Sequence, residues 1–194
     1  MNHLYNHAAI SYANLWWKQD RLLLQRMKKA GGMGAVLPDI ASAYSVIRGI
    51  PGGRNSAHWQ RIANQLGDLP KLTAANYVQT VEEWQSKLGS EHNLLSAASK
   101  FLWFHSKNPV KILDRRATKA LHFTNGTYSD YCTLWTAEYK QSELQIKSAI
   151  VKLIEQLDCT VIPVEGRKEF LAVVNQKWFA ERIFDKYLWD QGGK

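Results

Sequence analysis

The stretch QSELQIKSAIVKLIEQL, residues 141–157, decides the fold class that the sequence predicts. Its apolar residues recur every three or four positions, which is the spacing of one buried helix face. They are Ile146, Ile150, Leu153, Ile154 and Leu157. Similar spacing recurs along nearly the whole chain, and only residues 159–164 have the composition of an extended segment, too short to imply a sheet. The sequence therefore predicts an all-α fold.

Further helices are expected on both sides of this stretch. They cover residues 38–48, 56–66, 74–88, 93–104, 114–121, 128–139 and 175–190. A first helix turns its apolar residues inward, namely Leu15, Leu22, Leu23 and Met27. Glycine clusters at residues 31–34 and 50–53 indicate helix ends and turns, because neither continues as the Gly-Lys-Ser/Thr of a phosphate loop.

The breaks between the predicted helices are short. None is long enough to be a flexible linker between domains, and no internal repeat or low-complexity tract interrupts the chain. We therefore expect residues 1–194 to form one compact multi-helix domain, and we leave open whether that domain has two lobes around a cleft.

The charge of the chain points to a polyanionic partner. The 194 residues include 25 Lys and Arg against 17 Asp and Glu, a net charge of +8, together with eight Trp. Clustered Lys and Arg gain affinity for nucleic acid by releasing counterions from phosphates. Nucleic acid is therefore the favoured partner, with a merely basic surface as the alternative.

Several classes of site are not expected. Cys132 and Cys159 are too far apart for a metal-binding pair, and five histidines show no ligand spacing, namely His3, His7, His58, His92 and His122. We therefore expect neither a metal nor an organic cofactor. The N-terminus has no basic segment followed by an apolar run, and no stretch approaches the ~18 apolar residues that span a bilayer. A cytoplasmic protein without a membrane partner is expected.

The segment SKFLWFH, residues 99–105, offers a candidate amine. On a helical wheel Lys100 lies opposite the apolar cluster of this helix, so we expect its side chain to leave the core. Pro109 then turns the chain back to a new helix that begins at Asp114. The alternatives are a solvated lysine and an aspartate that only caps its helix, although capping does not prevent Asp114 from facing a cleft shared with Lys100.

Five cations surround this segment: Lys107, Lys111, Arg115, Arg116 and Lys119. Arg115 and Arg116 are expected in the first turn of a helix, where positive charge opposes the helix dipole. Their position favours contacts with phosphates over a simple solvated face. Trp103 lies on the same helix as Lys100, away from the apolar cluster, where packing against a neighbouring helix is favoured over stacking on a base.

These residues resemble the helix-hairpin-helix DNA glycosylases, and more closely the bacterial 8-oxoguanine DNA glycosylase-like proteins. The similar residues are Ser99-Lys100-Phe101-Leu102-Trp103-Phe104, Asn108-Pro109, Ile112-Leu113-Asp114-Arg115-Arg116-Ala117, Ala120-Leu121 and Arg182 to Trp189 before Gly192. They cover about a quarter of the chain. Residues 89–95 stand where the family has a glycine-rich hairpin, and the interval from Lys100 to Asp114 is shorter than in typical members.

The resemblance implies a reaction and a set of roles. Lys100 would attack C1′ of a nucleotide flipped out of duplex DNA, and Asp114 would orient the amine and stabilise the transition state. A Schiff base would then permit strand cleavage. Trp103 and Asp185 would border the base pocket, while Lys107, Lys111, Arg115, Arg116 and Lys119 would hold the DNA backbone.

The sequence leaves three functions to compare. The leading one is an all-α DNA glycosylase, with or without lyase activity, that acts in DNA repair or in antiviral defence. A basic helical module that binds nucleic acid without catalysis is the second, and it predicts that Lys100→Ala changes no chemistry. A helical scaffold or toxin-like interaction protein is the third, and it predicts little salt-dependent binding of DNA.

Overall fold

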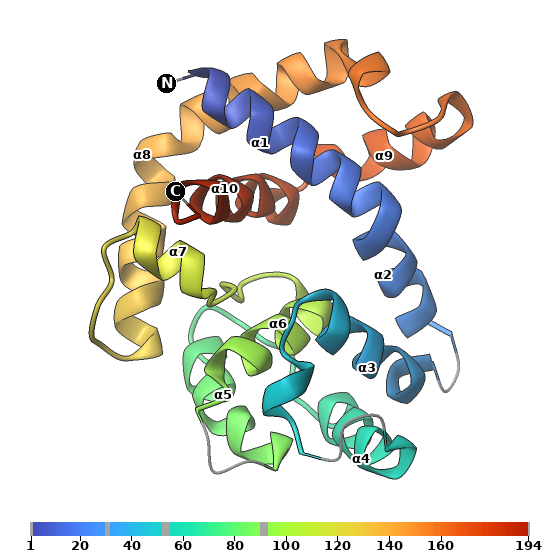
Figure 1. The fold of residues 1–194 in the computed structure, drawn as a ribbon, viewed down its shortest axis with the longest axis vertical. Helices are drawn as coiled ribbons and strands as arrows, with labels where there is room; N and C mark the ends of the chain where they lie inside the picture. The colour runs from blue at the N-terminus through green and yellow to red at the C-terminus, as the bar shows by residue number, and fades with distance from the viewer. Residues whose placement is uncertain (1, 30–31, 52–54, 90–92, 194) are drawn as a thin grey trace. The chain divides into compact units, whose positions relative to one another are not determined.

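The computed structural model describes residues 2–29, 32–51, 55–89 and 93–193, which are helical nearly throughout (Figure 1). The α-helices are α1 (Asn2–Leu15), α2 (Arg21–Met27), α3 (Gly32–Ala43), α4 (Ser56–Gly67), α5 (Tyr77–Trp84), α6 (Leu95–Ser106), α7 (Arg115–Ala120), α8 (Tyr128–Glu155), α9 (Arg167–Val174) and α10 (Lys177–Gln191). Short 3-10 turns are η2 (Ile47–Gly49), η3 (Gln85–Leu88), η4 (Leu157–Cys159) and η5 (Val164–Gly166). These described ranges contain no β-strand, and the predicted all-α fold is confirmed.

The stretch that predicted the fold lies in the longest of these helices. The helices expected at residues 128–139 and 141–157 are one continuous helix, α8. Thr127 starts it with a capping box, because Thr127 Oγ1 accepts a hydrogen bond from Asp130 N while Asp130 Oδ2 accepts one from Thr127 N. This reciprocal pair satisfies backbone donors at a helix start that no intrahelical carbonyl can reach.

The N-terminal helical segment begins with α1 and is interrupted by a π-helical turn, η1 (Trp16–Asp20). Leu23 beyond it is buried as predicted, but Leu22 is 44% exposed and the prediction that it turns inward is wrong. A π turn holds more residues than an α turn, so it rotates every later side chain relative to a regular wheel. That rotation explains the misplacement of Leu22.

Three other segments differ from the sequence prediction. Helix α3 begins at Gly32 and contains Pro38, which we had placed at its start. Residues 159–164 form no strand: Thr160 has an extended backbone (φ −111°, ψ 167°), but the 3-10 turns η4 and η5 flank it. Helix α9 was not predicted, because its eight residues are too few for the three- and four-residue spacing of apolar side chains to be recognised in the sequence.

The chain divides into two compact units. Unit 1 comprises residues 1–21 and 114–194, and in it α1 packs along both α8 and α10 (Figure 1). Aromatic rings fill its core, with Phe179 in contact with Tyr12, Trp16 and Phe170. Such edge-to-face arrangements add to the burial energy of the rings.

Unit 2 comprises residues 22–113 and therefore contains α2 from Leu22 onward, together with α3 to α6. Helix α3 packs on α4, and α5 packs on α6. Phe101 of α6 lies edge-on to Trp59 and to Trp84, with ring centroids 5.9 Å and 6.2 Å away. The expectation of a single domain stays a prediction, and the question of two lobes around a cleft stays open. Within the described residues, no helix combines the length and apolar character needed to cross a membrane.

Candidate functional site

The candidate nucleophile, Lys100, is buried in unit 2. Only 2% of its surface is exposed, so the expectation that its side chain leaves the core is wrong. Its amine nitrogen, Nζ, donates hydrogen bonds to Ser96 Oγ at 2.7 Å and to Leu113 O at 3.1 Å. A lysine is rarely buried this fully unless its amine has partners, and these two acceptors meet that requirement.

The burial of helix α6 explains why the helical wheel placed Lys100 on the wrong side. Every residue from Ala97 to Phe104 is buried, so this helix has no broad solvent face on which Lys100 can lie. Ser99 adds a second polar tie, since its Oγ accepts a hydrogen bond from Leu113 N at 3.0 Å. The backbone of Leu113 is therefore fixed to α6 through both its N–H and its carbonyl group.

Asp114 follows Leu113 in the chain and belongs to unit 1. Its Oδ1 accepts a hydrogen bond from Arg116 N at 3.0 Å, which confirms the predicted N-cap of α7. Because Lys100 and Asp114 belong to different units, a cleft common to both side chains stays a prediction.

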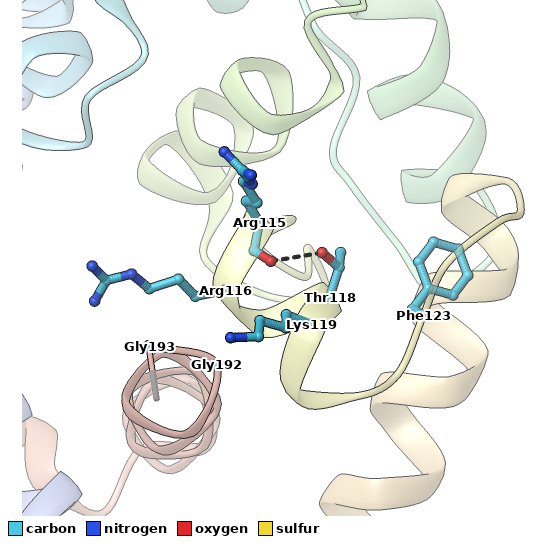
Figure 2. A pocket seen from close by; sticks show the side chains of 7 residues that line it. All are labelled: Arg115, Arg116, Thr118, Lys119, Phe123, Gly192 and Gly193. Carbon is cyan, nitrogen blue, oxygen red and sulfur yellow. Dashed lines mark hydrogen bonds between the residues drawn. The ribbon is translucent and has the colours of Figure 1, made fainter.

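Three of the predicted DNA-binding cations line one hollow in unit 1, which we call the α7 hollow. It has a volume of about 530 Å³ and is lined by Arg115, Arg116, Thr118, Lys119, Phe123, Gly192 and Gly193. Figure 2 shows Arg116 and Lys119 extending toward Gly192 and Gly193, whereas Arg115 points away from these glycines. The three cations are exposed, so the α7 hollow is positively charged and open to an anion.

Contacts within the chain also stabilise Arg116 at its position in the first turn of α7. Its guanidinium carbon lies 3.9 Å from the ring centroid of Trp189, and Lys186 Nζ lies 4.2 Å from the same centroid. Such cation–π contacts offset the unfavourable place of Arg116 in the first turn of α7. The unfavourable interaction of Arg116 with the helix dipole therefore does not by itself require a bound anion.

Two functional features of the α7 hollow were missed by sequence reasoning. The backbone of Gly192 lies so close to α7 that a Cβ at this residue would stand 1.9 Å from Arg116 O. Gly193 lies next to the Arg116 guanidinium, 3.1 Å from Nη1 by the same measure. The only sequence signal was a pair of glycines after a predicted helix, which ordinarily indicates a helix end.

The other two predicted DNA-binding cations belong to unit 2. Lys107 caps the C-terminus of α6 with a positive φ of 57°, and burial, followed by the nearby charge of Lys28, lowers its pKa. Lys111 is buried, with 8% of its surface exposed. These two lysines are not among the residues that line the α7 hollow, and their contact with DNA stays a prediction.

The two predicted base-pocket residues have structural partners. Trp103 is 1% exposed, and its ring lies edge-on to Phe104, the next residue of α6, with centroids 5.0 Å apart. Its packing against a neighbouring helix stays a prediction. Asp185 of α10 accepts hydrogen bonds from Trp135 Nε1 of α8 at 2.8 Å and from Arg182 Nη1 at 2.9 Å. It therefore ties two helices of unit 1 together, and its place in a base pocket stays a prediction.

The segment in place of a glycine-rich hairpin is only partly described. Gly89 ends η3 with a left-handed backbone (φ 77°), whereas residues 90–92 lie outside the described residues. The expected glycine turns at 31–34 and 50–53 also fall partly on such residues, namely 31 and 52–53. Gly34, which we had placed in a turn, lies inside α3.

Neither a metal-binding group among the residues that the structure describes nor a similar known protein gives further information on this site. In the described part of the chain, no group of three or more His, Cys, Asp and Glu side chains is arranged to hold a metal ion. No family model matches the chain, and neither the curated proteins nor the solved structures include a similar one.

Proposed function

We propose that this chain is a DNA glycosylase in which Lys100 is the amine nucleophile. The observation that carries the proposal is the burial of Lys100, whose Nζ is held by Ser96 Oγ and Leu113 O. A lysine attacks only after it has lost a proton, and burial disfavours the charged form of an amine. An amine kept away from water and fixed in direction is what such a reaction needs.

The proposed reaction replaces the bond between C1′ and the base with a bond between C1′ and Lys100 Nζ. Asp114 is the proposed partner that stabilises the positive charge developing on the sugar. Its Oδ1 is already fixed by the N-cap of α7, so the carboxylate is held in one orientation. Breaking of the C1′–O4′ bond, with a proton passing from the nitrogen to O4′, would open the sugar ring and give a Schiff base, which would permit strand cleavage as a second step.

DNA would be held by phosphate contacts in unit 1. Arg115, Arg116 and Lys119 are exposed around the α7 hollow, and Gly192 and Gly193 leave their part of its wall without side chains. The net charge of +8 supports a polyanionic partner independently of this hollow. Repair and antiviral defence are both compatible with this proposal.

Borohydride trapping tests the proposed nucleophile. Protein is incubated with a duplex that carries an abasic site, or one of a panel of modified bases, and any Schiff base is reduced to a covalent adduct. We expect the wild type to form the adduct and Lys100→Met to lose it completely, because methionine keeps the volume of the side chain without the amine.

A matched lysine in the same unit provides the control. Lys87 is exposed in η3, so Lys87→Met should form the adduct at the wild-type rate. Circular dichroism melting would show that both variants fold. A Lys100→Met protein that is folded and still forms the adduct would rule out Lys100 as the nucleophile.

The α7 hollow favours a second candidate function, a nucleic-acid-binding module without catalysis. In that case no adduct forms, yet duplex DNA binds with an affinity that falls as salt rises. Replacing both Arg115 and Lys119 with Gln would then lower the slope of log K against log salt by roughly 0.9 per lost contact. The exposed cations Lys140 and Lys168 of the same unit serve as the control pair.

A further inference from the structure

A hydroxyl group lies one helical turn before the buried amine. Ser96 and Lys100 are four residues apart on α6, so their side chains project from the same side of the helix. The bond from Lys100 Nζ to Ser96 Oγ, at 2.7 Å, is shorter than the 3.1 Å bond from the same nitrogen to Leu113 O. Ser96 is half-buried, whereas Lys100 and the other residues from Ala97 to Phe104 are buried.

The two acceptors fix the direction of the amine. Leu113 O is itself held in place, because Leu113 N donates a hydrogen bond to Ser99 Oγ at 3.0 Å. A neutral amine has two N–H bonds and one lone pair. Two acceptors at fixed positions orient both N–H bonds, and they thereby set the direction of the lone pair that forms the new bond.

We infer that Ser96 is the positioning residue for the Lys100 amine, an inference that rests on the proposed function. With a base-bearing nucleotide, the Nζ lone pair forms the bond to C1′, and the electron pair of the C1′–base bond leaves with the base. The nitrogen gives one proton to water and the base takes one from water. With an abasic aldehyde, Nζ forms an imine with C1′ and the carbonyl oxygen leaves as water. Ser96 forms and breaks no covalent bond in either case.

The pH profile of trapping separates positioning from proton loss. The probe is a duplex with an abasic site, the protein is saturating, and adduct formation is followed from neutral to alkaline pH. At alkaline pH the amine is neutral in every variant, so a lower plateau rate reports lost orientation. We expect Ser96→Ala to lower this plateau about tenfold or more, because small misplacements of a reacting group cost large factors in rate.

A matched pair of variants controls for shape. Ser96→Thr and Ser96→Val have nearly the same side-chain shape and differ in the hydroxyl group, so Thr should retain the wild-type plateau and Val should lose it. This pair keeps the test decisive even if the Ala variant melts early. Ser86→Ala should leave the profile unchanged, although it removes a comparable hydroxyl of unit 2 that donates to Glu83 O at 2.8 Å.

The outcomes distinguish this inference from the proposed function. A wild type that forms no adduct overturns both. A wild type that forms the adduct, together with Ser96→Val at the wild-type plateau, overturns the positioning role alone and leaves Lys100 as nucleophile. A loss of DNA affinity in Ser96→Val that fully accounts for the lower rate also overturns positioning, because orientation of the amine acts after binding.

Discussion

The two units carry the positive charge of the chain very unequally. Unit 2 contains 11 Lys and Arg against 5 Asp and Glu, whereas unit 1 contains 14 against 12. Most of the net charge of +8 therefore belongs to unit 2, while the three cations of the α7 hollow are a local cluster in a nearly balanced unit. The net charge of a unit attracts a polyanion at long range, whereas a cluster of cations binds it at one contact. The two features are therefore separate arguments for a polyanionic partner.

The units also differ in which buried groups resist ionisation. Burial lowers the pKa of His105 and of His58 in unit 2, and the charge of Arg61 lowers that of His58 further. In unit 1 burial raises the pKa of Tyr5 and Tyr139 to about 12 and that of Tyr131 well above its usual value. Burial opposes the charged form in each case, so unit 2 should be the more sensitive to mild acid and unit 1 to alkali.

The largest effect is expected from a methyl group at Gly192 of unit 1. A Cβ there would stand 1.9 Å from Arg116 O, so α7 and α10 must separate to accept Gly192→Ala. We expect this variant to lose about 1–3 kcal/mol in urea denaturation, the usual cost of overpacking. Gly67→Ala of unit 2 is the control, because nothing lies within 4 Å of its Cβ and alanine lowers the entropy of the unfolded chain. Equal denaturation curves for the two variants would contradict the close approach of α7 and α10.

Helices of both units were predicted well where local periodicity and capping define them, whereas α3 of unit 2 was displaced. The expected helix at residues 56–66 is α4 (Ser56–Gly67), and the one at 93–104 is α6 (Leu95–Ser106). Asn55 and Asp114 cap the helices that follow them, as short polar side chains before a periodic segment indicate. Local periodicity and capping depend on neighbours in the chain, so the sequence alone contains that information.

The candidate site was harder to predict because its contacts are tertiary. A helical wheel assumes one buried face, whereas α6 is buried on nearly all sides and Lys100 with it. The partner of Arg116 is Trp189, far along the chain on another helix, and no local pattern indicates that pair. Gly192 was visible only as a helix end, although its close approach to Arg116 gives it a second role.

A smaller effect is expected from alkali on unit 1. Tyr139 has a pKa of about 12 in the folded chain against 10.0 when unfolded, because of burial first and then the charges of Glu181 and Glu143. A raised pKa contributes stability that is present below pH 10 and is lost as pH rises toward 12. Tyr139→Phe keeps the stacking on Trp135, so its urea midpoint should fall less than that of the wild type over this range. An identical fall in both proteins would show that Tyr139 ionises without hindrance.

The smallest effect is expected from mild acid on unit 2. His105 of α6 is half-buried, and its pKa lies below 6.5 because burial disfavours the imidazolium. The unfolded chain therefore takes up protons first as pH falls through 6.5, and stability is lost from there down to the folded pKa. Hydrogen exchange, corrected for its intrinsic pH dependence, should show α6 losing more protection than α8 when pH drops from about 7 to about 5.5.

Two histidine variants test the origin of that acid sensitivity. His105→Gln removes the titrating group from α6, so part of the protection lost at low pH should return, with the remainder assigned to His58 of α4. His3→Gln in α1 should change nothing, because His3 is exposed in unit 1. Equal loss of protection in α6 and α8, unaffected by His105→Gln, would mean that the two units open together and that the buried histidines do not set the response to acid.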